Sequence, residues 1–313
     1  MINAWNVMST KEHHFTYEAA LAAAEKINWH VDDVIGGDKR LDFSKRFMPE
    51  ALARVEPLTF LSDDERRTLN QIRANGYLCL FGILEEFILP FVLDHARTRL
   101  GGEGARTRAL LQFASEEAKH IDLFKRFRDE FECGFGSPCP VIGPADAIGR
   151  AILAHDPLAV ALIILQGEWM TQRHYVESVK DDGELDPQFK SLLRHHWMEE
   201  AQHAKLDTLM VEALVKRYTM RQLLSAVDEY FEIIRFLDGG LMQQVELDVA
   251  SFELATGRQL TDSERESLVE VQRQATRWTF LGSGMTHRTF LATIGRMSPS
   301  ARARVEQYAP VYS

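Results

Sequence analysis

Two copies of one short pattern carry the residues whose types and spacing could do chemistry. The pattern is Glu-Glu-Ala-x-His, and its copies stand 83 residues apart. Each copy sets a Glu and a His three residues apart: Glu117 with His120, and Glu200 with His203. On a helix, residues three apart share one face. Carboxylate and imidazole together bind divalent transition metals. The repeat therefore predicts a metal site between two helices.

An acid also stands inside each of two strongly apolar segments. Glu168 lies within Leu-Ile-Ile-Leu-Gln-Gly-Glu-Trp, and Glu85 and Glu86 lie within Leu-Phe-Gly-Ile-Leu-Glu-Glu-Phe-Ile-Leu. Glu85 precedes Glu117 by 32 residues, the interval that also separates Glu168 from Glu200. Its neighbours at helical spacing are apolar, which indicates a buried stripe. Glu85 is the preferred candidate, and Glu86 remains the alternative because a nearby proline could shift the helical phase.

Four buried carboxylates and two buried imidazoles need a compensating charge, since burying such groups alone costs several kcal/mol. Two divalent cations would neutralise four carboxylates. This donor set suits two iron ions, with manganese possible, whereas zinc prefers fewer ligands. Two such metals can use O2 as a co-substrate, which no side chain does alone. The sequence has no flavin, NAD or iron–sulfur fingerprint, so an external donor must supply electrons.

His196 is the candidate seventh ligand. It lies four residues before Glu200 and seven before His203, so it shares their helical face. A third imidazole would increase electron donation to one metal. We expect it to stabilise a bridged peroxo form.

Four further residues are candidates for the surroundings of the ligands. Glu116 and Glu199 each precede a candidate ligand and could accept an N–H from the opposing imidazole. Asp207, four residues after His203, could orient that ring. Tyr175 lies seven residues after Glu168 and therefore on the same helical face. It could meet a substrate cavity or act as a redox-active phenol.

Helix start signals divide the chain into the elements that must position these groups. Ser62-Asp-Asp-Glu65 is a capping box, and Asp156-Pro157 and Asp186-Pro187 each supply an N-cap followed by a proline. Four helices are expected, at 62 to about 99 with a bend at a proline, about 105 to 132, 156 to about 181, and 186 to about 217.

The remaining segments complete an all-α prediction. Residues 1–61 and 134–155 are expected to be irregular with short helices, and 219–313 to add two or three helices. No alternating strand pattern occurs. The predicted fold is a single domain, 1–313, with a four-helix core bundle at 62–217 and additional helices at 219–313.

Composition limits the class of partner. The 313 residues hold 36 Lys and Arg against 46 Asp and Glu, a formal charge of −10. Such an acidic chain is a poor candidate for binding nucleic acid or an anionic membrane. The sequence shows no signal-peptide pattern and no uncharged apolar stretch of about 20 residues. Three cysteines form no disulfide framework. We expect a cytoplasmic protein that does not bind membranes.

The order Glu, Glu-x-x-His, Glu, His-x-x-x-Glu-x-x-His resembles the ferritin-like di-iron family typified by p-aminobenzoate N-oxygenase, over about residues 62–217. The resemblance implies seven metal ligands: Glu85, Glu117, His120, Glu168, His196, Glu200 and His203. That family oxidises arylamines to hydroxylamine, nitroso or nitro products with O2 and supplied electrons. Its relatives oxidise other substrates.

The resemblance implies an O2-dependent di-iron oxygenase that oxidises an amine or arylamine through a peroxo-bridged di-iron intermediate. The alternatives are a di-iron hydroxylase or an aldehyde-oxidising enzyme acting on another small molecule, or a ferroxidase that handles iron. The expected partners are a small-molecule substrate, a redox partner and a second copy of the chain in a homodimer.

Overall fold

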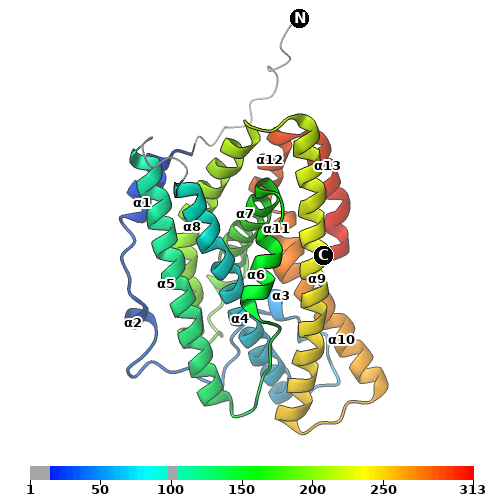
Figure 1. Cartoon of the computed structure of the whole chain (residues 1–313). Helices are drawn as coiled ribbons and strands as arrows, with labels where there is room; N and C mark the ends of the chain where they lie inside the picture. The colour runs from blue at the N-terminus through cyan, green and yellow to red at the C-terminus, as the bar shows by residue number, and fades with distance from the viewer. Residues whose placement is uncertain (1–14, 98–103) are drawn as a thin grey trace, which may run out of the picture.

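The computed structural model describes residues 15–97 and 104–313, and helices dominate them (Figure 1). Within these ranges the only β contacts are two isolated bridges, Gly36 with Lys39 and Arg46 with Leu185. The predicted all-α class is therefore confirmed. The predicted helix end near Arg99 lies outside the described residues.

A four-helix bundle forms the core of the molecule. Its helices are α4 (Asp63–Arg97), α5 (Gly104–Phe135), α7 (Pro157–His174) and α8 (Pro187–Val215). Helix α4 pairs with α5, α7 pairs with α8, and α5 also contacts α8. The four predicted helices agree with these bounds, except that the third ends earlier and continues as a π-helical turn, η1 (Tyr175–Val179).

The predicted start signals act as expected. At α4, the Ser62 amide donates to Glu65 at 2.8 Å, and the Glu65 amide donates to the Ser62 hydroxyl at 3.3 Å. The side chain of Asp156 caps α7, and that of Asp186 caps α8. Each cap satisfies an amide that has no partner within its own helix. Local sequence therefore sets the residue at which each helix begins. This start sets the position of each ligand residue along the bundle axis.

Helix α4 is long and apolar enough to cross a membrane by length and composition alone, with 61% of its apolar window buried inside the molecule. This helix is not the uncharged apolar stretch of about 20 residues that the sequence was expected to lack, because Glu85 and Glu86 interrupt its apolar residues. The core helix of a water-soluble bundle meets the same criteria. Here α4 packs against α5, α6 and α9, which cover it on several sides.

Short helices occupy the two segments that were predicted to be irregular with short helices, within the described residues. They are α1 (Tyr17–Ala24), α2 (Val31–Val34), α3 (Glu50–Ala53) and α6 (Ala145–Leu153). Helix α1 packs on α5 and α8, and α6 packs on α4. The long connection from α5 to α7 therefore also covers the outside of the bundle.

The C-terminal region holds more helices than predicted. Helix α9 (Met220–Thr256) is 37 residues long and packs on α4 and α7. After it come α10 (Asp262–Arg277), the π-helical turn η2 (Trp278–Gly282), α11 (Ser283–Met285), α12 (Arg288–Met297), α13 (Pro299–Tyr308) and the 3-10 turn η3 (Ala309–Tyr312). In Figure 1, α9 and α5 lie on opposite sides of the bundle. The extra helices form a second layer against α4 and α7.

Candidate metal centre

The candidate site lies between two separate apolar cores. On α4, one core extends to Phe81 and the other resumes at Phe87, so Glu85 stands between them. The same change of core occurs on α5 around Glu117 and on α8 around Glu200. Each helix thus presents its polar residues at one height, and these residues form a buried polar layer across the bundle.

Two overlapping groups of ligand atoms occupy this layer. One group comprises Glu85, His120, His196 and Glu200, and the other comprises Glu117, His120, Glu200 and His203. Within each group the ligand atoms lie within 4.8 Å of one another, and all the residues are buried. The groups share His120 and Glu200. Such an arrangement would hold two neighbouring metal ions.

One carboxylate oxygen lies at the centre of the three imidazoles. Oε1 of Glu200 is 3.1 Å from Nδ1 of His120, 3.2 Å from Nε2 of His196 and 3.1 Å from Nδ1 of His203. Nε2 of His196 is also 3.0 Å from Oε1 of Glu85. Three helices, α4, α5 and α8, therefore direct their donor atoms to a common point.

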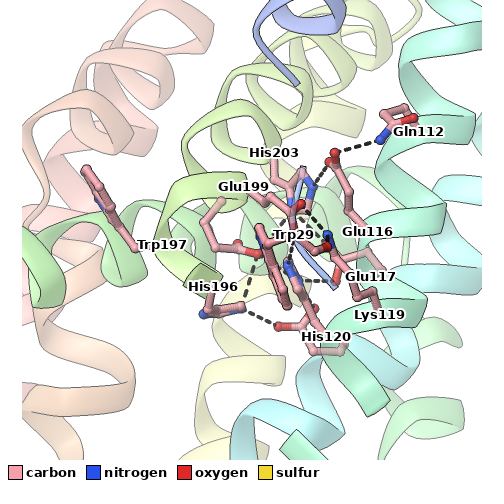
Figure 2. A network of polar contacts seen from close by, with 12 residues as sticks. Trp29, Gln112, Glu116, Glu117, Lys119, His120, His196, Trp197, Glu199 and His203 are labelled. Atoms are coloured by element: carbon pink, nitrogen blue, oxygen red, sulfur yellow. Dashed lines mark hydrogen bonds and ion pairs between the residues drawn. The ribbon is translucent and has the colours of Figure 1, made fainter. Parts of the chain in front are cut away.

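The outer nitrogens of two imidazoles meet glutamates from the opposite helix (Figure 2). Nε2 of His120 is 2.9 Å from Oε2 of Glu199, and Nε2 of His203 is 2.8 Å from Oε2 of Glu116. A carboxylate in this position accepts the Nε2–H, so Nδ1 is the nitrogen that can bind a metal. Both Nδ1 atoms face the centre of the site. The two outer glutamates therefore fix the tautomer that a metal ligand needs.

Each outer glutamate has a second donor. Gln112 donates to Glu116 at 2.8 Å, and Nζ of Lys119 lies 2.5 Å from Glu199. The Lys119 ammonium also stands 3.8 Å from the centroid of the Trp29 ring, which stacks at 6.2 Å on the ring of His120. Neither Lys119 nor Trp29 was a candidate from sequence. Trp29 comes from the segment between α1 and α2, where no spacing relates it to the motifs.

Several buried ligand atoms make no hydrogen bond of good geometry with the described residues, although some lie in ion-pair contacts. They are both oxygens of Glu117, Oε2 of Glu85, Oε2 of Glu168 and Nδ1 of His120. Leaving buried polar atoms unpaired costs about 1–3 kcal/mol each. Bound divalent cations would satisfy all of these oxygen and nitrogen donors. The residues of this site therefore fit a dimetal centre.

The carboxyls differ in their protonation. Burial alone would raise the pKa of Glu200, but His196 and His203 hold it well below its usual range. Burial raises the pKa of Glu168 well above its usual value, and the Glu200 carboxylate raises it further. A protonated Glu168 donates a hydrogen bond to Glu200. Two divalent cations would reverse this preference by favouring the ionised form of Glu168.

The imidazoles show the opposite balance. Burial would lower their pKa values, but the surrounding carboxylates outweigh it. Glu199 and Glu200 raise the pKa of His120 well above its usual value, and Glu200 and Glu116 do the same for His203. Protons therefore carry the positive charge that the carboxylates demand. Metal ions would displace these protons, as metal binding to histidine generally does.

The remaining candidates lie at different distances from the centre. Glu86 is exposed, whereas its neighbour Glu85 is 1% exposed and belongs to the first group. Glu168 belongs to neither group, although it contacts Glu200. Asp207 is buried, but its oxygens make no hydrogen bond within residues 15–97 and 104–313, and His203 bonds Glu116 instead.

Tyr175 does not meet the centre. Its ring stacks on Trp197 at 4.4 Å, and Trp197 points away from the cluster (Figure 2). The α-helix α7 ends at His174, and Tyr175 begins the π-helical turn that follows it.

An apolar cavity of about 490 Å³ lies beside the polar layer. Side chains from α4, α6, α7, α9 and η2 line it, among them Phe81, Leu84 and Phe280. Leu84 directly precedes Glu85, and Gly167, also in the wall, directly precedes Glu168. The single charged side chain in the wall is the exposed Arg235. This volume suits a small organic molecule.

A buried Glu/His layer in a four-helix bundle, next to an apolar cavity, defines a ferritin-like oxidoreductase of the dimetal type. The family model described as p-aminobenzoate N-oxygenase AurF matches residues 8–257. The chain belongs to this family. It is therefore an oxygenase or oxidase with a metal cofactor that uses O2. No curated protein matches the chain.

The chain is also similar to solved structures of an R2-like ligand-binding oxidase. A point mutant with an anaerobically reconstituted Mn/Fe cofactor is 15% identical, with 87% of this chain and 92% of that chain covered and a TM-score of 0.48. A second mutant, reconstituted aerobically, is 16% identical, with 87% and 93% covered and a TM-score of 0.47.

Proposed function

We propose that the protein is an N-oxygenase that transfers oxygen from O2 to the nitrogen of a small amine, with arylamines as the preferred class. The observation that carries this proposal is the pair of overlapping Glu/His groups beside an apolar cavity, in a member of the p-aminobenzoate N-oxygenase family. Oxidation of carbon, either in a hydroxylation or in the oxidation of an aldehyde, is the competing outcome.

We propose seven metal ligands, contributed by all four bundle helices: Glu85, Glu117, His120, Glu168, His196, Glu200 and His203. The two metal ions, iron with manganese as an alternative, would supply O2 activation. The side chains neutralise charge and hold the imidazoles by their outer nitrogens. Glu116 and Glu199 act as positioning residues, because each accepts an Nε2–H at under 3 Å.

The cavity favours an organic substrate over iron as the substrate. Its wall is apolar near the polar layer, and no carboxylate from the described residues lines it. A path for iron ions requires acidic side chains, and a protonated alkylamine would lack a counter-ion here. A neutral arylamine can enter such a cavity without this cost. The wall residues would exclude water and orient the amine.

Four further features belong to this proposal. An external electron donor is needed because the family's chemistry consumes electrons that the chain itself does not carry. We also propose that the protein is cytoplasmic and forms a homodimer. Residues 1–313 form a single domain in this proposal.

The decisive experiment loads the protein with Fe(II) without oxygen, adds isotopically labelled O2 and a reductant, and analyses products by mass spectrometry. The panel contains arylamines, alkylamines and aldehydes. Labelled hydroxylamine, nitroso or nitro products support the proposal. Label on carbon, or turnover of aldehydes alone, contradicts it.

A variant tests whether the cavity holds the substrate. A Cβ added at Gly167 would stand 3.2 Å from Cδ2 of Leu84, so Gly167→Ala should push Leu84 into the cavity. We expect a higher KM that grows with amine size. Gly239→Ala is the matched control, since Gly239 also lines the cavity but a Cβ there meets nothing within 4 Å. Equal effects of both changes would exclude this cavity.

A further inference from the structure

A chain of hydrogen bonds crosses the core beside the candidate metal centre and plays no part in the proposed ligand set. The Tyr77 hydroxyl is 3.4 Å from Nδ1 of His174, and Nε2 of His174 is 2.9 Å from Oγ of Ser283. The Ser283 hydroxyl donates to the carbonyl of Thr279 at 3.2 Å. Tyr77, His174 and Ser283 are 2%, 3% and 0% exposed, so water does not compete for these bonds.

The far end of the chain fixes the tautomer of His174. The Ser283 hydroxyl donates its proton to the carbonyl of Thr279, so its oxygen accepts the Nε2–H of His174. Nδ1 therefore carries a lone pair and accepts the phenolic proton of Tyr77. The pair thus joins a phenol donor to a free imidazole base.

Both partners are neutral at rest. Burial, and then the Arg173 charge, lowers the pKa of His174 to about 3. Burial, and then the carboxylates of Glu200 and Glu85, raises the pKa of Tyr77. The phenolic proton therefore stays on Tyr77 unless the ring loses an electron, which makes a phenol strongly acidic.

One aromatic ring separates Tyr77 from the candidate centre. Tyr77 stacks on Phe81 with centroids 4.3 Å apart, and the ring of Phe81 meets that of His196 edge-on at 5.7 Å. Phe81 also lines the cavity. Packed rings in van der Waals contact provide a short path for electron tunnelling. Tyr77 therefore lies close to both the proposed metal ligand and the substrate cavity.

We propose that Tyr77 is a redox-active residue that donates one electron toward the metal centre, with His174 as its built-in proton acceptor. The electron goes to a one-electron oxidant generated from O2 at that centre. The O–H bond of Tyr77 breaks, and an N–H bond forms at Nδ1 of His174. A neutral tyrosyl radical and an imidazolium result. A one-electron reductant then restores the phenol, and the proton returns from His174.

Two of the three other buried tyrosines in the described residues, Tyr175 and Tyr230, lack this arrangement. The Tyr175 ring stacks on Trp197 at 4.4 Å, and within the described part of the chain its hydroxyl makes no hydrogen bond. Tyr230 donates to the amide oxygen of Gln166, which is a poor proton acceptor. The proposal requires the oxygenase or oxidase chemistry of the family but not an amine substrate.

The test is freeze-quench electron paramagnetic resonance after O2 is added to the Fe(II)-loaded protein, with and without substrate. We expect a tyrosyl signal that narrows when the protein contains ring-deuterated tyrosine. Tyr77→Phe should abolish the signal, and Tyr175→Phe, the matched control, should keep it. Metal content and circular dichroism establish that each variant folds and binds metal.

A second variant separates the proton from the electron. In His174→Gln the side chain can still donate to Ser283 and accept from Tyr77, but it is not a base, so the signal should be lost while metal content stays unchanged. A signal that persists in Tyr77→Phe, or none in the wild-type protein, overturns the proposal. Product analysis with amines reports on N-oxygenation separately, so the two proposals can fail independently.

Discussion

Adjacent glutamates on α4 show how helical phase decides which carboxylate enters the polar layer. Glu85 is 1% exposed and lies 3.0 Å from His196, whereas Glu86 faces solvent. The two residues are both glutamates in the same local sequence. They differ only by one step around the helix, about 100°. They therefore form a matched pair for experiment.

Glu85→Gln should weaken metal binding, and Glu86→Gln should not. Glutamine keeps the size of the side chain but removes the charge that a cation needs, so we expect roughly 10-fold or greater loss of affinity in the first variant. Elemental analysis after Fe(II) loading and gel filtration measures the difference. Equal metal content in the two variants would contradict the assignment of Glu85.

The outer shell of the site has an approximate symmetry that the repeat of Glu-Glu-Ala-x-His explains. In each copy the first Glu reaches the imidazole of the other copy, Glu199 to His120 and Glu116 to His203. Spacing alone therefore predicted these contacts. The partners of the two glutamates, Lys119 and Gln112, break the symmetry, because one brings a charge and the other does not.

At the scale of helices, α9 shows that packing can override the local preference of a glycine pair. Gly239-Gly240 resembles a turn, since each glycine destabilises a helix by roughly 0.5–1 kcal/mol relative to alanine. Helix α9 nevertheless continues through the pair for 37 residues. A Cβ at Gly240 would stand 3.3 Å from Ile142, so close packing against the α5–α7 connection accounts for one glycine.

A buried ion pair joins α4 to α9 and α10. Nη1 of Arg73 is 3.4 Å from Oδ2 of Asp248 and donates to Thr276 at 2.6 Å, and Gln244 donates to Asp248 at 2.7 Å. Both charged side chains are less than 5% exposed. Burial raises the pKa of Asp248 from 3.8 to about 6, against the opposing effect of Arg73.

Removing Arg73 should destabilise the protein in a pH-dependent way. Because the folded-state pKa of Asp248 is raised, the stability it contributes is complete below pH 3.8 and is lost as pH rises through about 6. Arg73→Met raises this pKa further, since it deletes the compensating charge, and should cost about 3–5 kcal/mol once Asp248 ionises.

Urea unfolding of Arg73→Met and of the double variant Arg73→Met/Asp248→Asn measures this cost. The double variant has no carboxyl to ionise, so its free energy of unfolding should exceed that of the single variant by more as pH rises. Comparing the two variants cancels every other titrating group. A difference that stays constant with pH would show that Asp248 does not carry the effect.

At the scale of the whole molecule, the sequence predicted what local periodicity encodes. The caps, the four bundle helices and the inward phase of Glu85, Glu117 and Glu200 all follow from residues within a few positions of one another. Tyr77 and His174 are 97 residues apart and meet only because α4 and α7 pack together. Trp29 likewise reaches His120 from a short connection, where no helical period applies.

Metal removal should destabilise the whole fold rather than one corner of it, because the polar layer lies between the two apolar cores and joins all four bundle helices. Without cations, the layer keeps unpaired oxygens on Glu85, Glu117 and Glu168. A ligand that binds only the folded state at 100 times its Kd adds about 2.7 kcal/mol of stability. Chelation should therefore lower the melting temperature by several degrees, measured by calorimetry on the same preparation before and after metal is restored.

Glu117→Gln/Glu200→Gln, which removes one acid from each Glu-x-x-His motif, should be insensitive to chelator. If wild-type protein melts at the same temperature with and without metal, the layer is stabilised by its own protons, and the charge argument for a dimetal centre fails.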